Sequence, residues 1–322
     1  MPEVKRSQPI WAISDGRAGN ARQAMALAHA VAGLRSMPVQ EQRLAPPAPW
    51  RWLAPRWCPG SHYALGSAFA GTAPALAIGC GRQAALATRL LRGRGSFGVQ
   101  ILDPRLSARH WDLLVVPEHD QVRGENVLTL LGSLNPVDEV WLAAGRKDFP
   151  ELGTLPGPRL VLLLGGPTAQ VPWHSEQLAP LCAQLGEWLT STGGSLLVSG
   201  SRRTPKQARP ILRQALRGLP SSLLWLDEDD GPNPLPGMLG WADAIVASAD
   251  SVNQLSEAAA TRVPVMAAFA DQAQGRVGRF VAQLREHGRL LPDLAALSLE
   301  QKLEPLRETQ RIAQQVVQRA GL

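Results

Sequence analysis

The sequence predicts an α/β protein built from two Rossmann-like domains that face each other across a cleft. Its 322 residues exceed the usual size of one domain and suit two domains of about 150 residues each. Apolar runs of strand length alternate with segments of helical period, which is typical of parallel sheets with crossover helices. The alternation stops in a turn-rich stretch at residues 149–158 and then begins again.

The first half contains a series of apolar runs that predict buried strands, with two segments of helical period between them. Two of the strands end in Asp103-Pro104 and Pro117-Glu118, where proline cannot continue a hydrogen-bonded ladder. The strands are expected at residues 9–14, 39–44, 75–78, 97–102 and 111–116, and the helices at residues 21–34 and 83–91.

The second half repeats the pattern after the turn-rich stretch. Its strands are expected at residues 159–164, 195–199, 223–226, 244–247 and 263–267, and its helices at residues 176–190, 252–260 and 299–320. We therefore expect a first domain at residues 1–150 and a second at residues 151–298. A C-terminal helix in residues 299–322 is expected to pack back on the first domain.

Composition and charge restrict the class of protein. No run of about 18 uncharged apolar residues predicts a membrane span, and no signal-peptide pattern opens the chain, so we expect a cytoplasmic protein. The three cysteines are scattered and lack metal-ligand spacing, so no metal site is predicted. Residues 1–100 hold 12 Lys or Arg and 3 Asp or Glu, a net charge of +9, which favours an anionic partner.

Polar and glycine-rich motifs in the second half follow predicted strands, where parallel sheets place their ligand loops. Gly165 and Gly166 allow a backbone to approach a pyrophosphate closely, although a tight turn also needs glycine. The arginines and hydroxyls of the next motif suit a phosphate, although a basic surface turn is the alternative. This motif consists of Ser201, Arg202, Arg203 and Thr204.

A further segment, residues 237–257, runs from a helical turn through a short strand and a polar loop into a helix. Ser251 lies at the start of that helix, where a diphosphate is stabilised by free amide groups. Glu257 lies on its second turn, and its carboxylate suits the two hydroxyls of a ribose. These residues predict a site for a nucleoside diphosphate in the second domain.

Two clusters in the first half are candidates for catalysis. Asp15 follows the first strand in a glycine-bearing loop and is a candidate carboxylate base. His119 and Asp120 follow the fifth strand beside Glu118, and a histidine among carboxylates is a candidate general base. A cluster of capping groups and ion pairs would have the same composition.

Gly79-Cys80-Gly81-Arg82-Gln83-Ala84 fits the dinucleotide fingerprint G-x-G-x-x-A, and Asp103 ends the next strand. This motif is the basis of an alternative function, an NAD-dependent sugar-nucleotide epimerase. Because the unit is not the first of the chain, we expect the glycines to serve the turn from strand to helix.

Trp50, Trp52 and Trp57 alternate with Arg51 and Arg56 among prolines. Tryptophan with arginine is typical of anchors at a membrane interface, so we expect peripheral contact with an anionic membrane, such as the inner membrane. A loop packed on its own tryptophans is the alternative. No recognised nucleic-acid motif accompanies these residues, so no nucleic-acid partner is predicted.

Several of these motifs together resemble the bacterial relatives of the plant mitochondrial-fission ("elongated mitochondria") family. The resemblance covers about residues 11–266. It is carried by residues 15–17, 100–104, 116–120, 164–167, 201–204 and 237–243.

This resemblance implies a GT-B-like fold, similar in its second half to the lipid-linked N-acetylglucosaminyltransferase of peptidoglycan synthesis. It places Glu257 at the ribose, Ser251 and Gly166 near the diphosphate, and the backbone around Met238 at the base. Where that enzyme has a histidine after paired glycines, this chain has Asn20 after Gly19.

The function expected from the sequence is glycosyl transfer from a UDP-type nucleotide sugar to a cell-envelope acceptor, such as a lipid-linked saccharide or lipopolysaccharide. No cofactor is obligatory for this reaction. In it, Asp15, His119 or Asp120 deprotonates the acceptor, and helix N-termini and arginines stabilise the leaving diphosphate. A non-catalytic recruitment protein with the same fold is the alternative of a different class.

Overall fold

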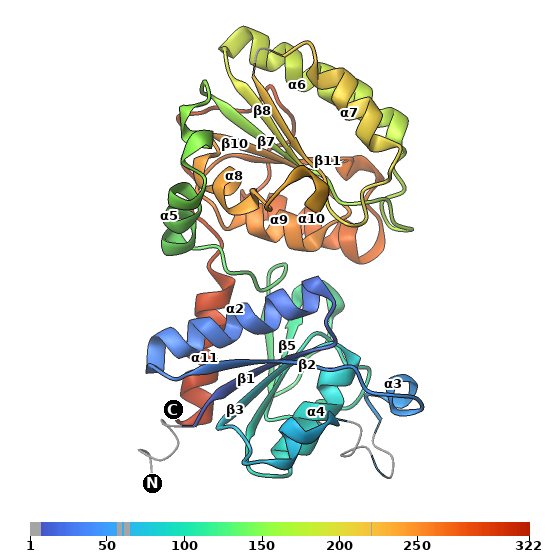
Figure 1. Cartoon of the computed structure of the whole chain (residues 1–322), viewed down its shortest axis with the longest axis vertical. Helices are drawn as coiled ribbons and strands as arrows, with labels where there is room; N and C mark the ends of the chain where they lie inside the picture. The colour runs from blue at the N-terminus through green and yellow to red at the C-terminus, as the bar shows by residue number, and fades with distance from the viewer. Residues whose placement is uncertain (1–7, 57–59, 61–64, 220) are drawn as a thin grey trace. The chain divides into compact units, whose positions relative to one another are not determined.

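The computed structural model describes residues 8–56, 60, 65–219 and 221–322. Two compact units divide the chain, and Figure 1 shows their elements. The first unit comprises the chain up to Pro136 together with Arg307–Leu322, and the second comprises Val137–Leu306. Each unit is a parallel sheet with helices on both faces, as the sequence predicts.

The sheet of the first unit has six parallel strands in the order β2-β1-β3-β4-β5-β6. This order reverses direction between β1 and β3, which makes that point the topological switch of the sheet. The strands are β1 (Ile10–Ser14), β2 (Val39–Arg43), β3 (Leu76–Cys80), β4 (Phe97–Ile101), β5 (Leu113–Pro117) and β6 (Val127–Leu130).

Alternating side chains of these strands build the two layers of the core. Ile10 and Ala12 face the helices α2 (Ala18–Arg35) and α11 (Glu308–Ala320), while Trp11 and Ile13 face the helix α4 (Arg82–Arg92). Short elements complete the unit: α3 (Trp50–Leu53), η2 (Ser67–Ala70), η3 (Ala108–His110) and η4 (Glu118–Asp120).

The sheet of the second unit has the order β11-β10-β7-β8-β9, so its topological switch lies between β7 and β10. Its strands are β7 (Arg159–Leu163), β8 (Ser195–Ser199), β9 (Ser222–Trp225), β10 (Ala244–Ser248) and β11 (Val265–Ala268). Nearly all side chains of β7, β8 and β10 are buried, which explains why these strands read as largely apolar runs in the sequence, whereas the edge strand β9 is exposed or half-buried.

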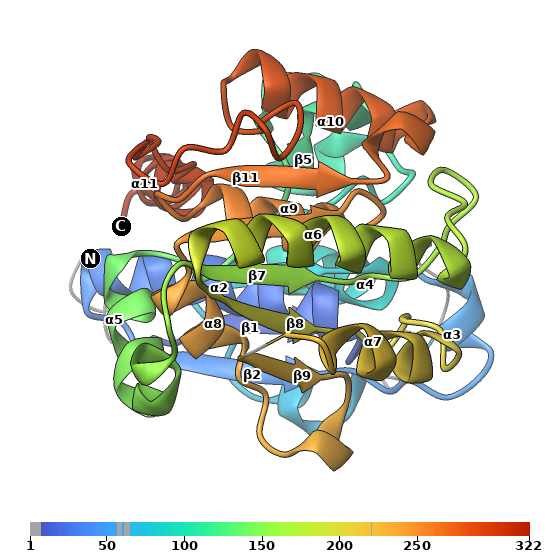
Figure 2. The ribbon, with the colours of Figure 1, turned by 90° about the horizontal axis from the view of Figure 1, so that it is seen from above.

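Helices cover both faces of this second sheet. The helices α6 (Leu178–Thr192) and α7 (Ala208–Leu216) lie on one face (Figure 2), and α8 (Leu235–Trp241) and α9 (Val252–Ala259) lie on the other. The remaining elements are α5 (Glu139–Asp148), η5 (Pro150–Thr154), η6 (Ser175–Gln177), η7 (Glu228–Asp230), η8 (Ala270–Gln272) and α10 (Gly275–Glu286).

The boundary of the first unit differs from the position expected at residue 150. The helix α5 belongs to the second unit, because Arg146 donates to the carbonyl of Gly240 at the end of α8. The turn-rich stretch at residues 149–158, which separates the two predicted domains, packs there too, since the indole of Trp241 donates to the carbonyl of Phe149. Its prolines and glycines therefore shape η5 within the unit.

The C-terminal helix packs on α2 in the first unit, but it begins at Glu308 instead of residue 299. Pro305 has no amide hydrogen to donate, and the amides of Leu303 and Leu306 bond to carbonyls of Arg262 and Ala259 in the second unit. The chain up to Leu306 is therefore held extended, and the helix forms only beyond it.

Candidate functional site

The candidate site of the first unit lies at the carboxyl edge of its sheet, at the switch between β1 and β3. A polar cavity of about 510 Å³ opens there, which is within the usual range for small-ligand sites. The loops after β1, β3 and β4 and the short helix α3 supply its walls. The lining residues include Asp15, Arg17, Asn20, Arg51, Trp52, Arg82, Gln83, Gln100 and Asp103.

Asp15 is held in this cavity by hydrogen bonds from both sides. Its Oδ1 accepts from Asn20 Nδ2 at 2.9 Å and from the amide of Arg17 at 3.2 Å. Asn20 lies in the first turn of α2, at the position where the resemblance implies a histidine. The Asn20 side chain therefore positions the Asp15 carboxylate. Because asparagine is not ionisable, Asp15 takes the place of that histidine as the ionisable group next to β1.

Cys80, the last residue of β3, contacts the Asn20 side chain that holds Asp15. Its thiol lies 3.6 Å from Asn20 Oδ1. Burial, and secondly the negative charge of Asp15, raise the pKa of the Cys80 thiol well above its ordinary value. This thiol is therefore protonated at neutral pH, and it donates to the side chain that positions Asp15.

The glycines of the dinucleotide-like motif lie in close contact with other residues of the protein. Gly81 has a φ of +96°, and a Cβ there would lie 2.7 Å from Asn20 Nδ2. A Cβ on Gly79 would lie 2.7 Å from Thr88 Cγ2 on α4. Both glycines therefore permit the close packing of β3, α4 and the Asp15 loop.

The second catalytic cluster lies elsewhere on the same edge. His119 is buried in η4 after β5, and its Nε2 is 4.0 Å from Asp120 Oδ1. Two strands separate β1 from β5, so these clusters lie about 14 Å apart at the spacing of neighbouring strands. Asp15 and His119 therefore belong to two separate sites and cannot act as one dyad.

The candidate site of the second unit lies at the switch between β7 and β10, and a buried carboxylate is at its centre. Asp250 Oδ2 accepts from the amide of Gly166 at 2.9 Å and from Arg203 at 3.0 Å. Its Oδ1 accepts from the indole of Trp173 at 2.9 Å. We call these four residues the Asp250 cluster.

The Asp250 cluster changes the interpretation of the two glycines. A Cβ on Gly165 would lie 2.0 Å from Asp250 Oδ2, and a Cβ on Gly166 would lie 2.0 Å from the Arg203 carbonyl oxygen. The glycines thus make room for the protein's own side chain and backbone, and the Gly166 amide already has an acceptor. The interpretation that they exist for approach to a pyrophosphate needs this correction.

The hydroxyls predicted to bind phosphate also have structural partners. Thr204 Oγ1 donates to the carbonyl of Gly165 at 2.7 Å and accepts from the amide of Ser201 at 2.8 Å. Ser201 Oγ accepts from the amide of Arg203 at 3.2 Å. Arg202 is exposed and bonds to no other side chain or carbonyl among the described residues.

Ser251 caps α9, where its Oγ accepts from the amide of Gln254 at 3.4 Å. Glu257, on the next turn, is only 2% exposed. Met238 is buried in α8, and its amide bonds to the Pro234 carbonyl within that helix. The structure thus brings Gly165, Gly166, Arg203, Thr204 and Ser251 together at one switch point, whereas Met238 contributes no hydrogen bond to that cluster.

Sequence reasoning did not select several residues of these sites: Asn20, Arg82, Gln100, Asp250 and Trp173. Asp250 had a usable signal, since it follows a fully buried strand in a polar loop. Trp173 had none, because its partner lies 77 residues further along the chain. No group of three His, Cys, Asp or Glu within the described ranges is placed to hold a metal ion.

Comparison with known proteins supports a family and a fold. The sequence pattern described as Mitochondrial fission ELM1 matches residues 18–320. The Mitochondrial fission protein ELM1 of Arabidopsis thaliana is 27% identical over 76% of this chain, and the match spans 63% of that protein's length. The uncharacterized protein RP120 of Rickettsia prowazekii is 22% identical over 95% of this chain and 96% of its own.

Among solved structures, a putative UDP-N-acetylglucosamine 2-epimerase from Listeria monocytogenes is similar with a TM-score of 0.54, covering 98% of this chain and 88% of that one at 11% identity. The UDP-N-acetylglucosamine 2-epimerase from Neisseria meningitidis, bound to UDP-GlcNAc, gives 0.51, covering 96% and 98% at 10% identity. MnaA of S. aureus with UDP gives 0.51, covering 96% and 88% at 11% identity. At such identities these likenesses establish the fold alone.

Proposed function

Because the chain belongs to the mitochondrial fission ELM1 family and has a sugar-transferase-like GT-B fold, we propose that it transfers a sugar from a UDP-type nucleotide sugar to a cell-envelope acceptor. One observation carries the proposal. Each sheet has a polar site at its topological switch, and the switch of the first unit holds a carboxylate in a cavity of ligand size.

In this proposal Asp15 is the general base that removes the proton of the acceptor hydroxyl. Asn20 and the Arg17 amide hold Oδ1, and Oδ2, which lies 3.7 Å from the exposed Arg17 guanidinium, is the oxygen that can receive the proton. Arg51 and Arg82 line the same cavity and suit an acceptor that carries phosphate. No cofactor takes part in the transfer.

The nucleotide is assigned to the second unit. Because Asp250 occupies the Gly166 amide, the diphosphate is assigned to the first turn of α9, the Ser251 hydroxyl and Arg202. Glu257 is assigned to the ribose, which requires its buried carboxylate to become accessible when the nucleotide binds. The backbone around Met238 is assigned to the base by resemblance alone.

Two other functions are compatible with the fold. Sugar-nucleotide 2-epimerisation is favoured by the likeness to proteins with that title, and it would use the nucleotide sugar without an acceptor. Recruitment without catalysis is suggested by the name of the Arabidopsis relative. Gly79 and Gly81 do not support a role for NAD, because side chains of the protein itself occupy the space beside their Cα atoms.

A binding and turnover series tests the proposal. UDP, GDP, CMP, ADP and NAD are first compared by calorimetry with the full chain, and UDP is expected to bind. UDP release from UDP-sugars is then measured with cell-envelope extracts, and Asp15→Asn should lower turnover while donor affinity stays unchanged. Asp103→Asn, in the same cavity, is the matched control.

The outcomes separate the three functions. Deuterium incorporation at C2 of the sugar in the absence of acceptor would establish the epimerase. A chain that binds none of the nucleotides would leave the recruitment function. UDP release that is equal in wild type and Asp15→Asn would remove Asp15 from the chemistry.

A further inference from the structure

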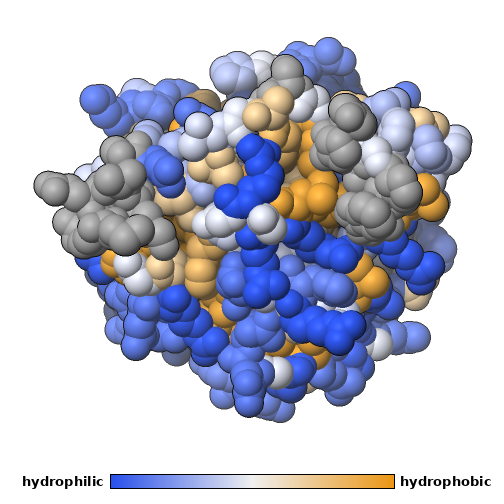
Figure 3. All heavy atoms as spheres, turned by 90° about the horizontal axis from the view of Figure 1, so that it is seen from below, coloured by the Kyte–Doolittle hydropathy of each residue, from blue (hydrophilic) through white to orange (hydrophobic). Residues whose placement is uncertain are grey.

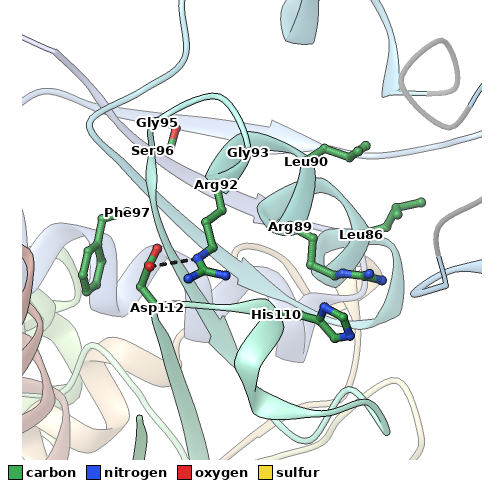
Figure 4. A pocket seen from close by; sticks show the side chains of 10 residues that line it. All are labelled: Leu86, Arg89, Leu90, Arg92, Gly93, Gly95, Ser96, Phe97, His110 and Asp112. Carbon is green, nitrogen blue, oxygen red and sulfur yellow. Dashed lines mark hydrogen bonds and ion pairs between the residues drawn. The ribbon is translucent and has the colours of Figure 1, made fainter.

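A second cavity of the first unit lies at the amino edge of its sheet, opposite to the Asp15 site. It has a volume of about 650 Å³. The end of α4, the start of β4 and the loop before β5 form its walls (Figure 4). Neither the transfer reaction nor the nucleotide uses this cavity.

The charged side chains of this cavity are mostly cationic. Arg89 and Arg92 extend from α4 toward the segment that carries His110 and Asp112 (Figure 4). Arg92 Nε donates to Asp112 Oδ1 at 2.8 Å, and Asp112 Oδ2 also accepts from the amide of Gly98 at 2.8 Å. Asp112, the one acidic residue of the lining, is thereby already engaged.

The remaining arginines are not neutralised by any carboxylate among the described residues. Arg89 donates to the carbonyl of Pro55, and Arg109 belongs to the adjacent η3. The carboxyl end of α4 contributes only about half a negative charge. Three guanidinium groups against one carboxylate and this half charge leave the cavity positive.

The positive charge around the cavity lowers the pKa of His110, one of the lining residues. Burial, and then the charges of Arg89, Arg109 and Arg92, lower the pKa of the His110 imidazole below its ordinary value. The histidine is therefore neutral at pH 7. A bound anion would offset the same charges and raise that pKa.

Apolar side chains adjoin the cationic ones. Leu86, Leu90 and Phe97 line the cavity itself. A neighbouring cavity of about 260 Å³ shares Arg89, Leu90 and Gly93 with it, and its other lining residues are Leu65, Phe69, Leu91 and Arg94. One molecule could therefore contact the guanidinium groups and an apolar wall together.

We propose that this cavity binds an anionic amphiphile, a phosphate monoester on an apolar chain, with the phosphate between Arg89 and Arg92 and the chain along Leu90. Arginine forms paired, charge-assisted hydrogen bonds with phosphate, which explains the choice of anion. The cavity lies at the opposite edge of the sheet from Asp15, so this site is independent of the proposed transferase reaction.

Calorimetry of the full chain with octyl phosphate tests this site. Octyl phosphate should bind at least tenfold more tightly than inorganic phosphate and than octanol. The double variant Arg89→Gln/Arg92→Gln should weaken binding at least tenfold. The glutamine at position 92 can still donate to Asp112, because its amide nitrogen takes the place of Arg92 Nε, and Asp112 keeps its bond from the Gly98 amide, so the fold is expected to persist.

The matched control is Arg213→Gln/Arg217→Gln, which removes the same charge from exposed positions of the second unit and should bind like wild type. If the cavity variant fails to fold, the pKa of His110 is measured instead in the wild-type protein, from a pH titration of its imidazole NMR signal. The pKa of His110 should rise when octyl phosphate is added.

Three results would overturn the proposal. Equal binding of inorganic phosphate would exclude the apolar subsite, and equal binding of octanol would exclude the anion subsite. Unchanged affinity of the cavity variant would move the ligand elsewhere. Vesicles of phosphatidic acid then distinguish the source, because binding to them that depends on Arg89 and Arg92 identifies a membrane lipid, whereas binding to soluble octyl phosphate alone identifies a free metabolite.

Discussion

The Asp250 cluster allows a stability prediction whose size follows from its contacts. The Asp250 side chain is 0% exposed and accepts three hydrogen bonds. In the variant Asp250→Ala, the Gly166 amide and the Trp173 indole lose their acceptor while both stay buried. Each buried donor without a partner costs about 1–3 kcal/mol.

The ion pair with Arg203 adds less to this cost. The Arg203 side chain is 49% exposed, so water solvates its charge once Asp250 is gone. Loss of this ion pair in Asp250→Ala therefore adds little to the cost of the two unpaired donors, and we expect this variant to lower the free energy of unfolding by about 3 kcal/mol. Arg203→Gln leaves a buried carboxylate without its cation, but that carboxylate keeps its bonds from Gly166 and Trp173, so we expect a smaller loss.

Equilibrium urea unfolding, followed by far-UV circular dichroism, measures both values. Asp271→Ala is the control, since this exposed carboxylate should change stability by less than about 0.5 kcal/mol. A loss below about 1 kcal/mol for Asp250→Ala would refute the reasoning, because both buried donors would then have found other partners. A loss for Arg203→Gln equal to that of Asp250→Ala would show that the ion pair dominates instead.

Four further predictions concern single sites. Glu257→Gln should weaken UDP binding by about 1–3 kcal/mol through loss of ribose hydrogen bonds, and equal calorimetric affinities would reject that assignment. Trp52 is 64% exposed beside Leu53, so Trp52→Ala/Leu53→Ala should reduce co-sedimentation of the protein with anionic vesicles, and added salt should reduce it as well. Equal recovery with neutral vesicles would argue against membrane contact. Trp57, the third tryptophan of the predicted anchor, lies outside the described residues. His110 has a lowered pKa, so its folded form binds fewer protons than the unfolded chain and stability should fall as the pH drops from 7 to 5; a His110→Gln variant with the same pH dependence would contradict this. Burial raises the pKa of Cys182 to about 11, so iodoacetamide at pH 8 should modify Cys182 only after denaturation, and rapid modification of the native protein, detected by mass spectrometry, would show that the site opens.

Membrane contact stays a prediction, and the exposed tryptophan that it depends on has a contact within the protein. Arg51 lies 5.7 Å from the ring centre of Trp52, so part of that ring already faces a cation of the protein. On the face drawn in Figure 3, apolar side chains lie in patches between hydrophilic ones. In the described part of the chain, no helix is both long and apolar enough to cross a membrane.

The central strands were predictable because they are buried on both faces and bounded by turn residues, whereas the edge strand β6 was missed because most of its side chains are only half-buried. Leu160 to Leu163 form such a run, and the structure contains a strand there. The helix α10 was missed, since Gly275 and Gly278 interrupt its pattern and only its packing against the unit stabilises it. Local preference could not reveal a helix that depends on tertiary contacts.

The sites were predictable in position but not in their contacts. Strand ends located Asp15, Gly166 and Ser251, because parallel strands deliver their loops to one edge. The partner of Gly166 is Asp250, and 84 residues separate the two in the sequence. Which carboxylate meets which amide depends on strand order, which residue patterns alone do not encode.

The return of α11 to the first unit has a consequence for synthesis on the ribosome. Ile312, Ala313, Val316 and Val317 fill the same core layer as Ile10 and Leu27. The whole second unit is translated between these two parts of one core, a delay of roughly ten to thirty seconds at ordinary elongation rates. During this delay the apolar layer that α11 later covers stays exposed on the nascent first unit. We therefore expect chaperones to bind the nascent chain until the last helix leaves the exit tunnel.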